Sequence, residues 1–250
     1  YTAVIASSLL NMFKDHSLID LRYDTIQALV FVLKKPKMPV LCYFDAFVAH
    51  FLEILESSSI QEMKKYLPLY SELVTLSGNN TFPFVERSLR LILDRFCDDL
   101  MMDFFNLVKS FLHALGHDFI EFSSETICQL VIILDSYKTL NADYCRGVLE
   151  IFSNIGAFAV GHHYLIIPQI CDTIDCKQTL PVVRVMAIES LRILVTSTDL
   201  QNYIGPIIRS LSTSLINDHE PTKEAAKLLL FALLDRGNTF LDYDVTSNLQ

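Results

Sequence analysis

Three side chains in the middle of the sequence have the spacing that a zinc site would use. His113 and His117 stand four positions apart, which is about one helical turn, and Glu121 follows four positions later. Imidazole and carboxylate groups on one helical face can hold zinc. Gly116 separates the histidines, however, and glycine commonly ends a helix, so the shared face need not persist. We interpret the three as polar residues at a corner between helices.

A second group of possible metal ligands comprises His162, His163, Cys171 and Cys176. Their spacing matches no zinc module, and no two cysteines in the sequence have Cys-x-x-Cys spacing. The helical pattern instead predicts surface histidines followed by core cysteines, of which at least one faces the interior. We predict no metal site in this chain.

Carboxylates gather at Asp98, Asp99 and Asp103, and paired acids can perform general acid–base catalysis. They fall at an expected helix start, where acidic side chains interact favourably with the helix dipole, and we prefer that structural interpretation. Glycine-rich phosphate loops, dinucleotide fingerprints and kinase catalytic motifs are missing from the sequence. We therefore predict no catalytic, cofactor-binding or metal-binding residue and no enzymatic activity of this segment.

The charge balance bears on possible partners. Lysine and arginine total 20 against 29 aspartates and glutamates, a net charge of -9, which argues against broad contact with nucleic-acid phosphates. The one basic run, at residues 34–37 (KKPK), is interpreted as a solvated loop in which Pro36 ends a helix. We expect protein partners, no nucleic acid and no membrane insertion.

Aromatic residues form helical stripes that have two interpretations. Phe44, Phe47 and Phe51 share one face of an expected helix, and a second stripe runs from Phe104 through Leu107 and Val108 to Phe111. Such stripes are typical of a hydrophobic core. The alternative is a groove for a partner helix, because aromatic side chains are enriched at binding centres.

Composition indicates a helical protein of a reducing compartment. Hydrophobic residues make up 51% of the chain and the mean hydropathy is +0.35, yet no apolar run is long enough to cross a membrane. The six cysteines include no Cys-x-x-Cys pair and mostly lie in apolar helical patterns, which favours a cytoplasmic or nuclear location over a secreted one. A peripheral position at endomembranes is compatible with this expectation.

Apolar residues recur at intervals of three and four, which predicts α-helices throughout. Ser59 to Glu62 reads as a capping box, Asn141 and Asp199 as N-caps, and Glu86, Arg90 and Asp94 as a ladder of charges on an exposed face. Four glycines, Gly78, Gly116, Gly161 and Gly237, are predicted to close helices. The twelve expected helices cover residues 1–15, 18–35, 39–57, 59–77, 82–98, 100–115, 119–136, 141–159, 162–175, 179–197, 200–217 and 220–236.

The expected helices pair with a period of about 40 residues, which is typical of HEAT repeats. Because one helix pair cannot bury its own apolar face, neighbouring pairs must stack. The sequence therefore predicts an all-α solenoid of about six HEAT-type antiparallel helix pairs, as one continuous domain over residues 1–250 and as part of a longer chain.

The last two pairs carry the clearest internal repeat. Residues 165–170 (LIIPQI) recur as residues 203–208 (YIGPII), and the shared proline is predicted to kink the first helix of each pair. In the second helices, a basic residue is followed by alanine three positions on and leucine four further: Arg184, Ala187 and Leu191, then Lys223, Ala226 and Leu230. The small alanine is predicted to let adjacent helices approach closely.

Several segments resemble the middle HEAT region of target-of-rapamycin kinases. They are residues 1–4 (YTAV), 9–18 (LLNMFKDHSL), 27–32 (QALVFV), 180–194 (LPVVRVMAIESLRIL) and 203–211 (YIGPIIRSL). Residues 36–160 match mainly in helix rhythm. The resemblance implies a parent Ser/Thr kinase of the phosphatidylinositol-kinase-related family, with this segment upstream of its FAT and kinase domains.

The resemblance implies a non-catalytic scaffold that supports complex assembly, dimer architecture and the binding of subunits such as a Raptor-like protein in growth and nutrient signalling. Two alternatives stay open. One is a nuclear-transport receptor of the importin type or another HEAT adaptor, which the acidic charge and the period also fit. The other is an independent enzyme with a dispersed site involving residues such as His113 or Asp103.

Overall fold

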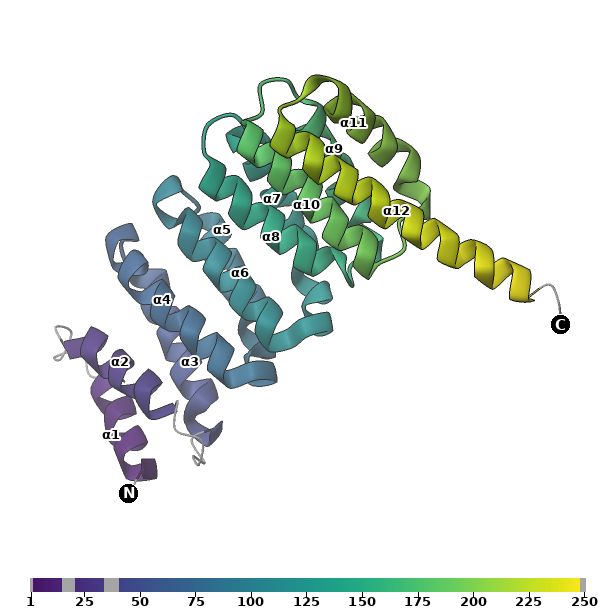
Figure 1. The fold of residues 1–250 in the computed structure, drawn as a ribbon. Helices are drawn as coiled ribbons and strands as arrows, with labels where there is room; N and C mark the ends of the chain where they lie inside the picture. The colour runs from purple at the N-terminus through teal and green to yellow at the C-terminus, as the bar shows by residue number, and fades with distance from the viewer. Residues whose placement is uncertain (1, 15–20, 34–40, 248–250) are drawn as a thin grey trace. The chain divides into compact units, whose positions relative to one another are not determined.

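The computed structural model describes residues 2–14, 21–33 and 41–247. Across these residues the chain is built from α-helices and short 3₁₀ turns, with no β-strand (Figure 1). The α-helices are α1 (Thr2–Lys14), α2 (Arg22–Leu33), α3 (Leu41–Ser57), α4 (Ile60–Ser77), α5 (Val85–Asp94), α6 (Met101–Leu115), α7 (Ser123–Tyr137), α8 (Ala142–Gly156), α9 (His163–Asp175), α10 (Pro181–Ser197), α11 (Ile204–Asn217) and α12 (Glu220–Ser247). The prediction of an all-α stack of helix pairs is confirmed.

Helix boundaries differ from the prediction mainly at helix starts and at the end of α12, which continues to Ser247. A 3₁₀ turn precedes α5, α6, α7, α9 and α11, so these helices begin one to four residues later than expected. The turns are η2 (Gly78–Phe84), η3 (Asp98–Leu100), η4 (Gly116–Phe122), η5 (Val160–His162) and η6 (Gln201–Tyr203). Such tight turns satisfy main-chain groups in a short connection, and the apolar period of the sequence does not distinguish them from an α-helix.

Helix caps follow the sequence in part. Ser59 and Glu62 form the predicted capping box, and the Asn141 side chain accepts from the main-chain N–H groups of Asp143 and Tyr144. Gly78 and Gly116 end α4 and α6 with φ of 54°, a conformation that favours glycine. Asp199 instead accepts from Gln201 at the start of η6, because the α-helix begins only at Ile204.

Two glycines do not end helices as predicted. Gly161 lies inside η5 without a positive φ, and α12 continues through Gly237 to Ser247. The proline repeat is also not equivalent in structure. Pro168 lies in the body of α9, whereas Pro206 lies in the first turn of α11, where its missing N–H has no intrahelical acceptor to lose. A kink at Pro206 is therefore not required by the fold.

The chain divides into two compact units, residues 1–122 and residues 123–250. In the first unit, α4 packs against α2 and α6, and α1 packs against α2 and α3. Aromatic rings fill the core: Phe51 lies edge-on to Tyr70 at 5.3 Å between ring centroids, and Phe47 stacks on Phe51. The phenol of Tyr70 is hydrogen-bonded to the Ser88 hydroxyl at 2.6 Å, and burial raises its pKa well above the usual value.

In the second unit the helices stack in two layers. The first helices α7, α9 and α11 pack side by side, as do the second helices α8, α10 and α12. Val148, Ala187 and Ala226 occupy equivalent positions on the second helices and are fully buried. The predicted alanine pattern is thus confirmed at Ala187 and Ala226. Leu191 is buried, whereas its counterpart Leu230 on α12 is only half-buried.

The close approach of α8 and α10 depends on Gly156. A methyl group at this position would lie 2.4 Å from Cδ2 of Leu194, a fully buried side chain. We expect Gly156→Ala to destabilise the chain by about 1–3 kcal/mol through overpacking. In a Leu194→Ala background the same change should be neutral or stabilising, because the new methyl group enters the cavity. Urea unfolding of the parent chain, the two single variants and the double variant measures this coupling. If Gly156→Ala changes the free energy of unfolding equally in both backgrounds, the proposed contact is contradicted.

No helix of the described segments has both the length and the hydrophobicity needed to cross a membrane.

Candidate protein-binding surfaces

The first group considered as possible metal ligands is divided by the end of a helix. His113 lies in the last turn of α6, whereas His117 and Glu121 lie in η4, beyond the positive-φ residue Gly116. All three side chains are exposed. The change of direction at Gly116 removes the common helical face on which a zinc site would depend.

The second group considered as possible metal ligands is separated by burial. His163 is only 2% exposed, and its Nε2 donates to the main-chain oxygen of Gly156 at 2.7 Å. The expectation of two surface histidines is therefore wrong for His163, which ties the start of α9 to the end of α8. Cys171 is buried as predicted, whereas the expectation of a core position is wrong for Cys176, which is half-exposed in the turn after α9.

The acidic group occupies a helix start, in agreement with the structural interpretation. Asp98 and Asp99 are exposed in η3, and Asp103 lies in the first turn of α6. Burial raises the pKa of Asp103, and the nearby Lys64 ammonium partly opposes that effect. Lys64 Nζ also lies 3.9 Å from Asp99 Oδ1.

No cluster of three or more histidine, cysteine, aspartate or glutamate side chains suited to a metal ion occurs within residues 2–14, 21–33 and 41–247. Cys97, Cys128, Cys145, Cys171 and Cys176 are free thiols, and burial raises the pKa of Cys145 and of Cys171 to about 11. The basic run at residues 34–37 lies outside the described residues.

Both aromatic stripes belong to the core. Phe44, Phe47 and Phe51 on α3 are buried, and so are all four members of the stripe on α6. The alternative of a partner groove at these stripes is therefore wrong, because their side chains are already covered within the first unit.

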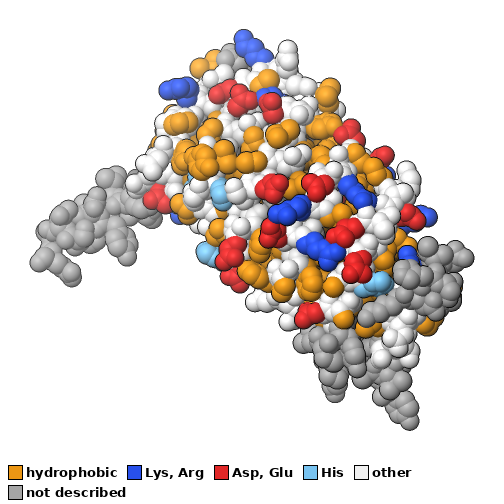
Figure 2. All heavy atoms as spheres, turned by 180° about the vertical axis from the view of Figure 1, so that it is seen from behind, with side chains coloured by type: hydrophobic (Ala, Val, Ile, Leu, Met, Phe, Trp, Pro, Cys, Tyr) orange, Lys and Arg blue, Asp and Glu red, His pale blue; other side chains and the backbone are white. Residues whose placement is uncertain are grey.

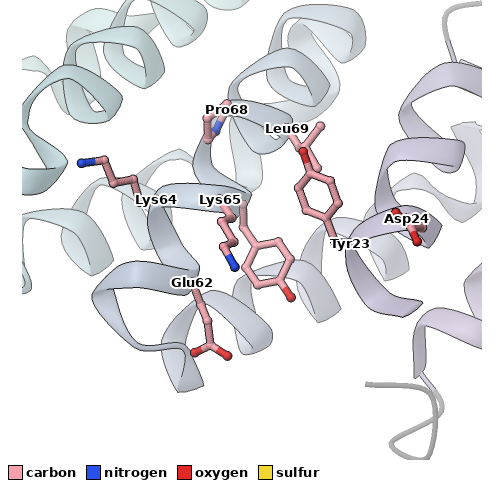
Figure 3. Close-up of a pocket in the computed structure, with 8 residues that line it drawn as sticks. Tyr23, Asp24, Glu62, Lys64, Lys65, Pro68 and Leu69 are labelled. Carbon is pink, nitrogen blue, oxygen red and sulfur yellow. The ribbon is translucent and has the colours of Figure 1, made fainter. Parts of the chain in front are cut away.

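One open pocket of about 730 Å³ lies on the first unit between α2 and α4. Tyr23 and Asp24 come from α2, and the rest of the lining comes from α4 (Figure 3). The lining comprises Tyr23, Asp24, Glu62, Lys64, Lys65, Tyr66, Pro68 and Leu69. The rings of Tyr23 and Tyr66 lie 6.4 Å apart, and burial raises the pKa of Tyr66.

This pocket combines both signs of charge with apolar surface, a lining suited to a peptide segment rather than to a single ion. Its lining includes Pro68, which stands inside α4 and cannot supply the N–H that the main-chain oxygen of Lys64 would otherwise accept. The residues of this pocket were not predicted from the sequence. A proline within the predicted helix 59–77 was the available signal, but the contribution of α2 could not be read from the sequence.

The second candidate is an apolar surface on α12, here called the α12 ridge, formed by Leu228, Phe231 and Leu234. Their exposed fractions are 51%, 67% and 63%. The equivalent positions on α10 are Glu189, Arg192 and Val195, of which the first two are exposed and the third is buried. At the first two of these positions α10 exposes charged side chains to water, whereas the α12 ridge exposes leucine and phenylalanine.

The α12 ridge was not predicted from the sequence either, although a signal was present. Leu228 and Phe231 follow Glu189 and Arg192 by 39 residues, so apolar residues replace charged ones at two equivalent positions. On the face drawn in Figure 2, some hydrophobic side chains lie among acidic and basic ones and others gather together. Isolated exposed apolar residues are ordinary, whereas large contiguous apolar patches are a feature of interaction sites.

Polar contacts one repeat apart hold these surfaces in place. In the first unit, the Arg95 guanidinium donates to the main-chain oxygens of Glu56 and Ser58 at the end of α3. In the second unit, Arg236 donates in the same way to the oxygens of Val195 and Thr198 at the end of α10. Each guanidinium thus satisfies carbonyl groups that a helix end leaves without an intrahelical donor.

Lys138 forms a further contact between neighbouring pairs. Its ammonium lies 2.8 Å from Asp135 and 2.6 Å from Asp172, which is on α9. Burial lowers the pKa of Lys138, but the two carboxylates raise it by more, so the pKa in the folded chain lies above the usual 10.5. A raised pKa stabilises the fold at all pH values below the unfolded value, and this contribution is lost as the pH rises beyond it.

We expect Lys138→Met to lower the free energy of unfolding by about 1–2 kcal/mol at neutral pH, because both carboxylates are more than half exposed and screened by water. The difference from the parent chain should stay constant from neutral pH up to about pH 10 and shrink above pH 10.5. Urea unfolding over this pH range tests whether the Lys138 ammonium stabilises the fold through the two carboxylates. A difference that grows with alkaline pH would contradict it.

Comparison of the sequence with protein-family models and with curated proteins gave no match. The resemblance to target-of-rapamycin kinases therefore rests on the sequence segments described above.

Proposed function

We propose that this chain is a non-catalytic HEAT-repeat scaffold within a target-of-rapamycin-like Ser/Thr kinase. In this proposal it supports complex assembly and dimer architecture and presents binding surface to a regulatory subunit of the Raptor-like kind, in the cytoplasm. The observation that supports a scaffold role most directly is the α12 ridge. It exposes apolar side chains at positions where the equivalent helix α10 exposes charged ones, as a surface for binding another protein would. The assignment to this kinase family depends on the resembling segments.

The mechanism of such a scaffold is geometric. Stacked pairs fix the spacing of exposed side chains, and contacts such as Lys138–Asp172 hold one pair against the next. The mixed pocket between α2 and α4 offers a second place at which a peptide segment of a partner can bind. No step of this role requires a reacting group in the described residues.

The first test is immunoprecipitation from the source cells with an antibody raised to this segment. Recovery of a protein of several hundred kilodaltons with Ser/Thr kinase activity supports the proposal. A band near 100 kDa that binds phenylalanine-glycine nucleoporin repeats would favour a transport receptor instead. A band at the 28.5 kDa of this chain would contradict the kinase-scaffold proposal.

A matched pair of substitutions tests the surface itself. Phe231→Arg introduces the residue type that α10 carries at the equivalent position, and Ile132→Arg alters an exposed apolar residue on α7. We expect Phe231→Arg to reduce recovery of the co-precipitated subunits and Ile132→Arg to leave it unchanged. Equal recovery with both variants would exclude the α12 ridge as the binding surface.

A further inference from the structure

The residues of the α12 ridge and its flanks are arranged symmetrically about Phe231. Leu228 lies three positions before Phe231, and Leu234 lies three positions after it. Lys227 lies four positions before Phe231, and Asp235 lies four positions after it. In either direction along the helix, Phe231 is therefore followed by a leucine and then by a charged side chain, and the two charges have opposite signs.

These five side chains share one exposed face of α12. Because an α-helix has 3.6 residues per turn, positions three or four away from Phe231 lie within about 60° of it around the helix axis. Lys227 and Asp235 are exposed, like the three members of the ridge. Ala226 and Leu229 lie on the opposite side of the helix and are fully buried. The symmetric face is therefore turned away from the helices of the second unit.

The preceding helix pair shows that a helix can cover this kind of surface. Val195 on α10 is equivalent to Leu234 and is only 2% exposed, in a helix that packs against α12. On the first helices, Ile170 of α9 is fully buried, whereas its equivalent Ile208 on α11 is 43% exposed. The last described pair thus retains apolar residues at positions that neighbouring helices cover in the pair before it.

A second copy of this chain is the occupant that the symmetric face fits. A two-fold axis pairs a surface with itself, so a residue before the axis meets the residue equally far after it in the other copy. With the axis beside Phe231 and the two helices antiparallel, Leu228 of one copy meets Leu234 of the other. Lys227 likewise meets Asp235, and the symmetry forms this pair of opposite charges twice. Charge and apolar surface are complementary in the same register.

We propose that α12 is a self-association surface, at which two copies of this chain pack antiparallel about a two-fold axis beside Phe231. The two phenylalanines lie at the centre, and the leucines and the ion pairs surround them. Lys227 also lies 3.2 Å from Glu224 on its own helix, an exposed pair that water screens and that leaves two N–H groups of the ammonium for another carboxylate. The proposed function enters only through the role of the α12 ridge as a binding surface.

Sedimentation equilibrium of the full chain over a range of concentrations tests self-association directly. We expect the mass to rise from 28.5 kDa towards twice that value, with a dissociation constant in the micromolar range, because the interface is small. Phe231→Arg places two like charges beside the axis and should leave the chain monomeric. Ile132→Arg on α7 introduces the same charge at another exposed apolar position and should preserve the dimer. Circular dichroism checks that both variants are folded.

An exchange of charges tests the antiparallel register. Lys227→Glu places a carboxylate opposite Asp235, and Asp235→Lys places an ammonium opposite Lys227. Each variant alone should therefore dimerise about tenfold more weakly than the parent chain. In an equimolar mixture of the two variants, each introduced charge meets the opposite introduced charge, and the remaining native Lys227 and Asp235 meet each other. The mixture should dimerise with the affinity of the parent chain, a recovery that a folding defect would not produce.

A chain that stays at 28.5 kDa at every concentration would overturn the proposal, as would a dimer that Phe231→Arg leaves intact. A mixture of the charge variants that dimerises no better than either variant alone would also overturn it. If the chain is monomeric but Phe231→Arg still reduces recovery of the co-precipitated subunits, the ridge binds a different protein. In that case self-association fails and the proposed scaffold function stands.

Discussion

Ala226→Glu is expected to lower the free energy of unfolding by more than about 3 kcal/mol and the thermal midpoint by on the order of 10 °C. Ala226 is fully buried where α12 packs against α10. A glutamate there would have to bury its carboxylate without a partner or separate the two helices. Both outcomes remove apolar contact and leave a charged group poorly solvated.

A substitution one half-turn away provides the control. Leu228→Glu places the same side chain on the same helix, at the position where α10 already carries the exposed Glu189. Because Leu228 is about half exposed, this variant should unfold within about 0.5 kcal/mol of the parent chain. Thermal unfolding monitored by circular dichroism compares the melting temperatures of the two variants. If both variants have the same melting temperature as the parent chain, α10 and α12 do not stack as described.

Asp218→Ala should destabilise the second unit by about 3–5 kcal/mol, because it leaves the Arg184 guanidinium buried without its carboxylate. Arg184 on α10 pairs with Asp218 at the end of α11, and each side chain is only 11% exposed. The guanidinium keeps its bonds to the main-chain oxygens of Cys176 and Thr179, which are neutral acceptors and do not balance its charge.

An exposed ion pair in the same chain serves as the reference. Glu86 and Arg90 on α5 lie 2.7 Å apart with about two thirds of each side chain exposed. Glu86→Ala should change the free energy of unfolding by no more than about 0.5 kcal/mol, because water screens the pair. Urea unfolding of both variants measures the contrast. Similar losses for Asp218→Ala and Glu86→Ala would mean that burial does not control the strength of these pairs.

The sequence predicted the repeating elements well because their signals are local. The capping box at Ser59, the asparagine cap at Asn141 and the buried alanines Ala187 and Ala226 depend on neighbouring residues or on a repeated pattern. Predictions failed where packing between pairs decides the outcome. His163 is an example: its helical position was compatible with the surface, yet the main-chain oxygen of Gly156 holds it inside.

The candidate surfaces were harder to predict than the fold. The basic residue Arg184 was recognised as part of a repeated pattern, but its partner Asp218 lies on another helix and required the stacking register. The α12 ridge likewise appears only when Leu228 and Phe231 are compared with their equivalents on α10. The pocket between α2 and α4 depends on the approach of two helices that are not consecutive in sequence.

The guanidinium contact from Arg236 to the end of α10 has a mechanical meaning. Because Arg236 donates hydrogen bonds to the main-chain oxygens of Val195 and Thr198, we expect tension applied to α12 to reach the carboxyl end of α10 first. Load then passes from one pair to the next through links of this kind, such as Arg184–Asp218 and Lys138–Asp172. Within the second unit each helix pair contacts only its neighbours, so one pair can unfold under tension while the adjacent pairs stay folded.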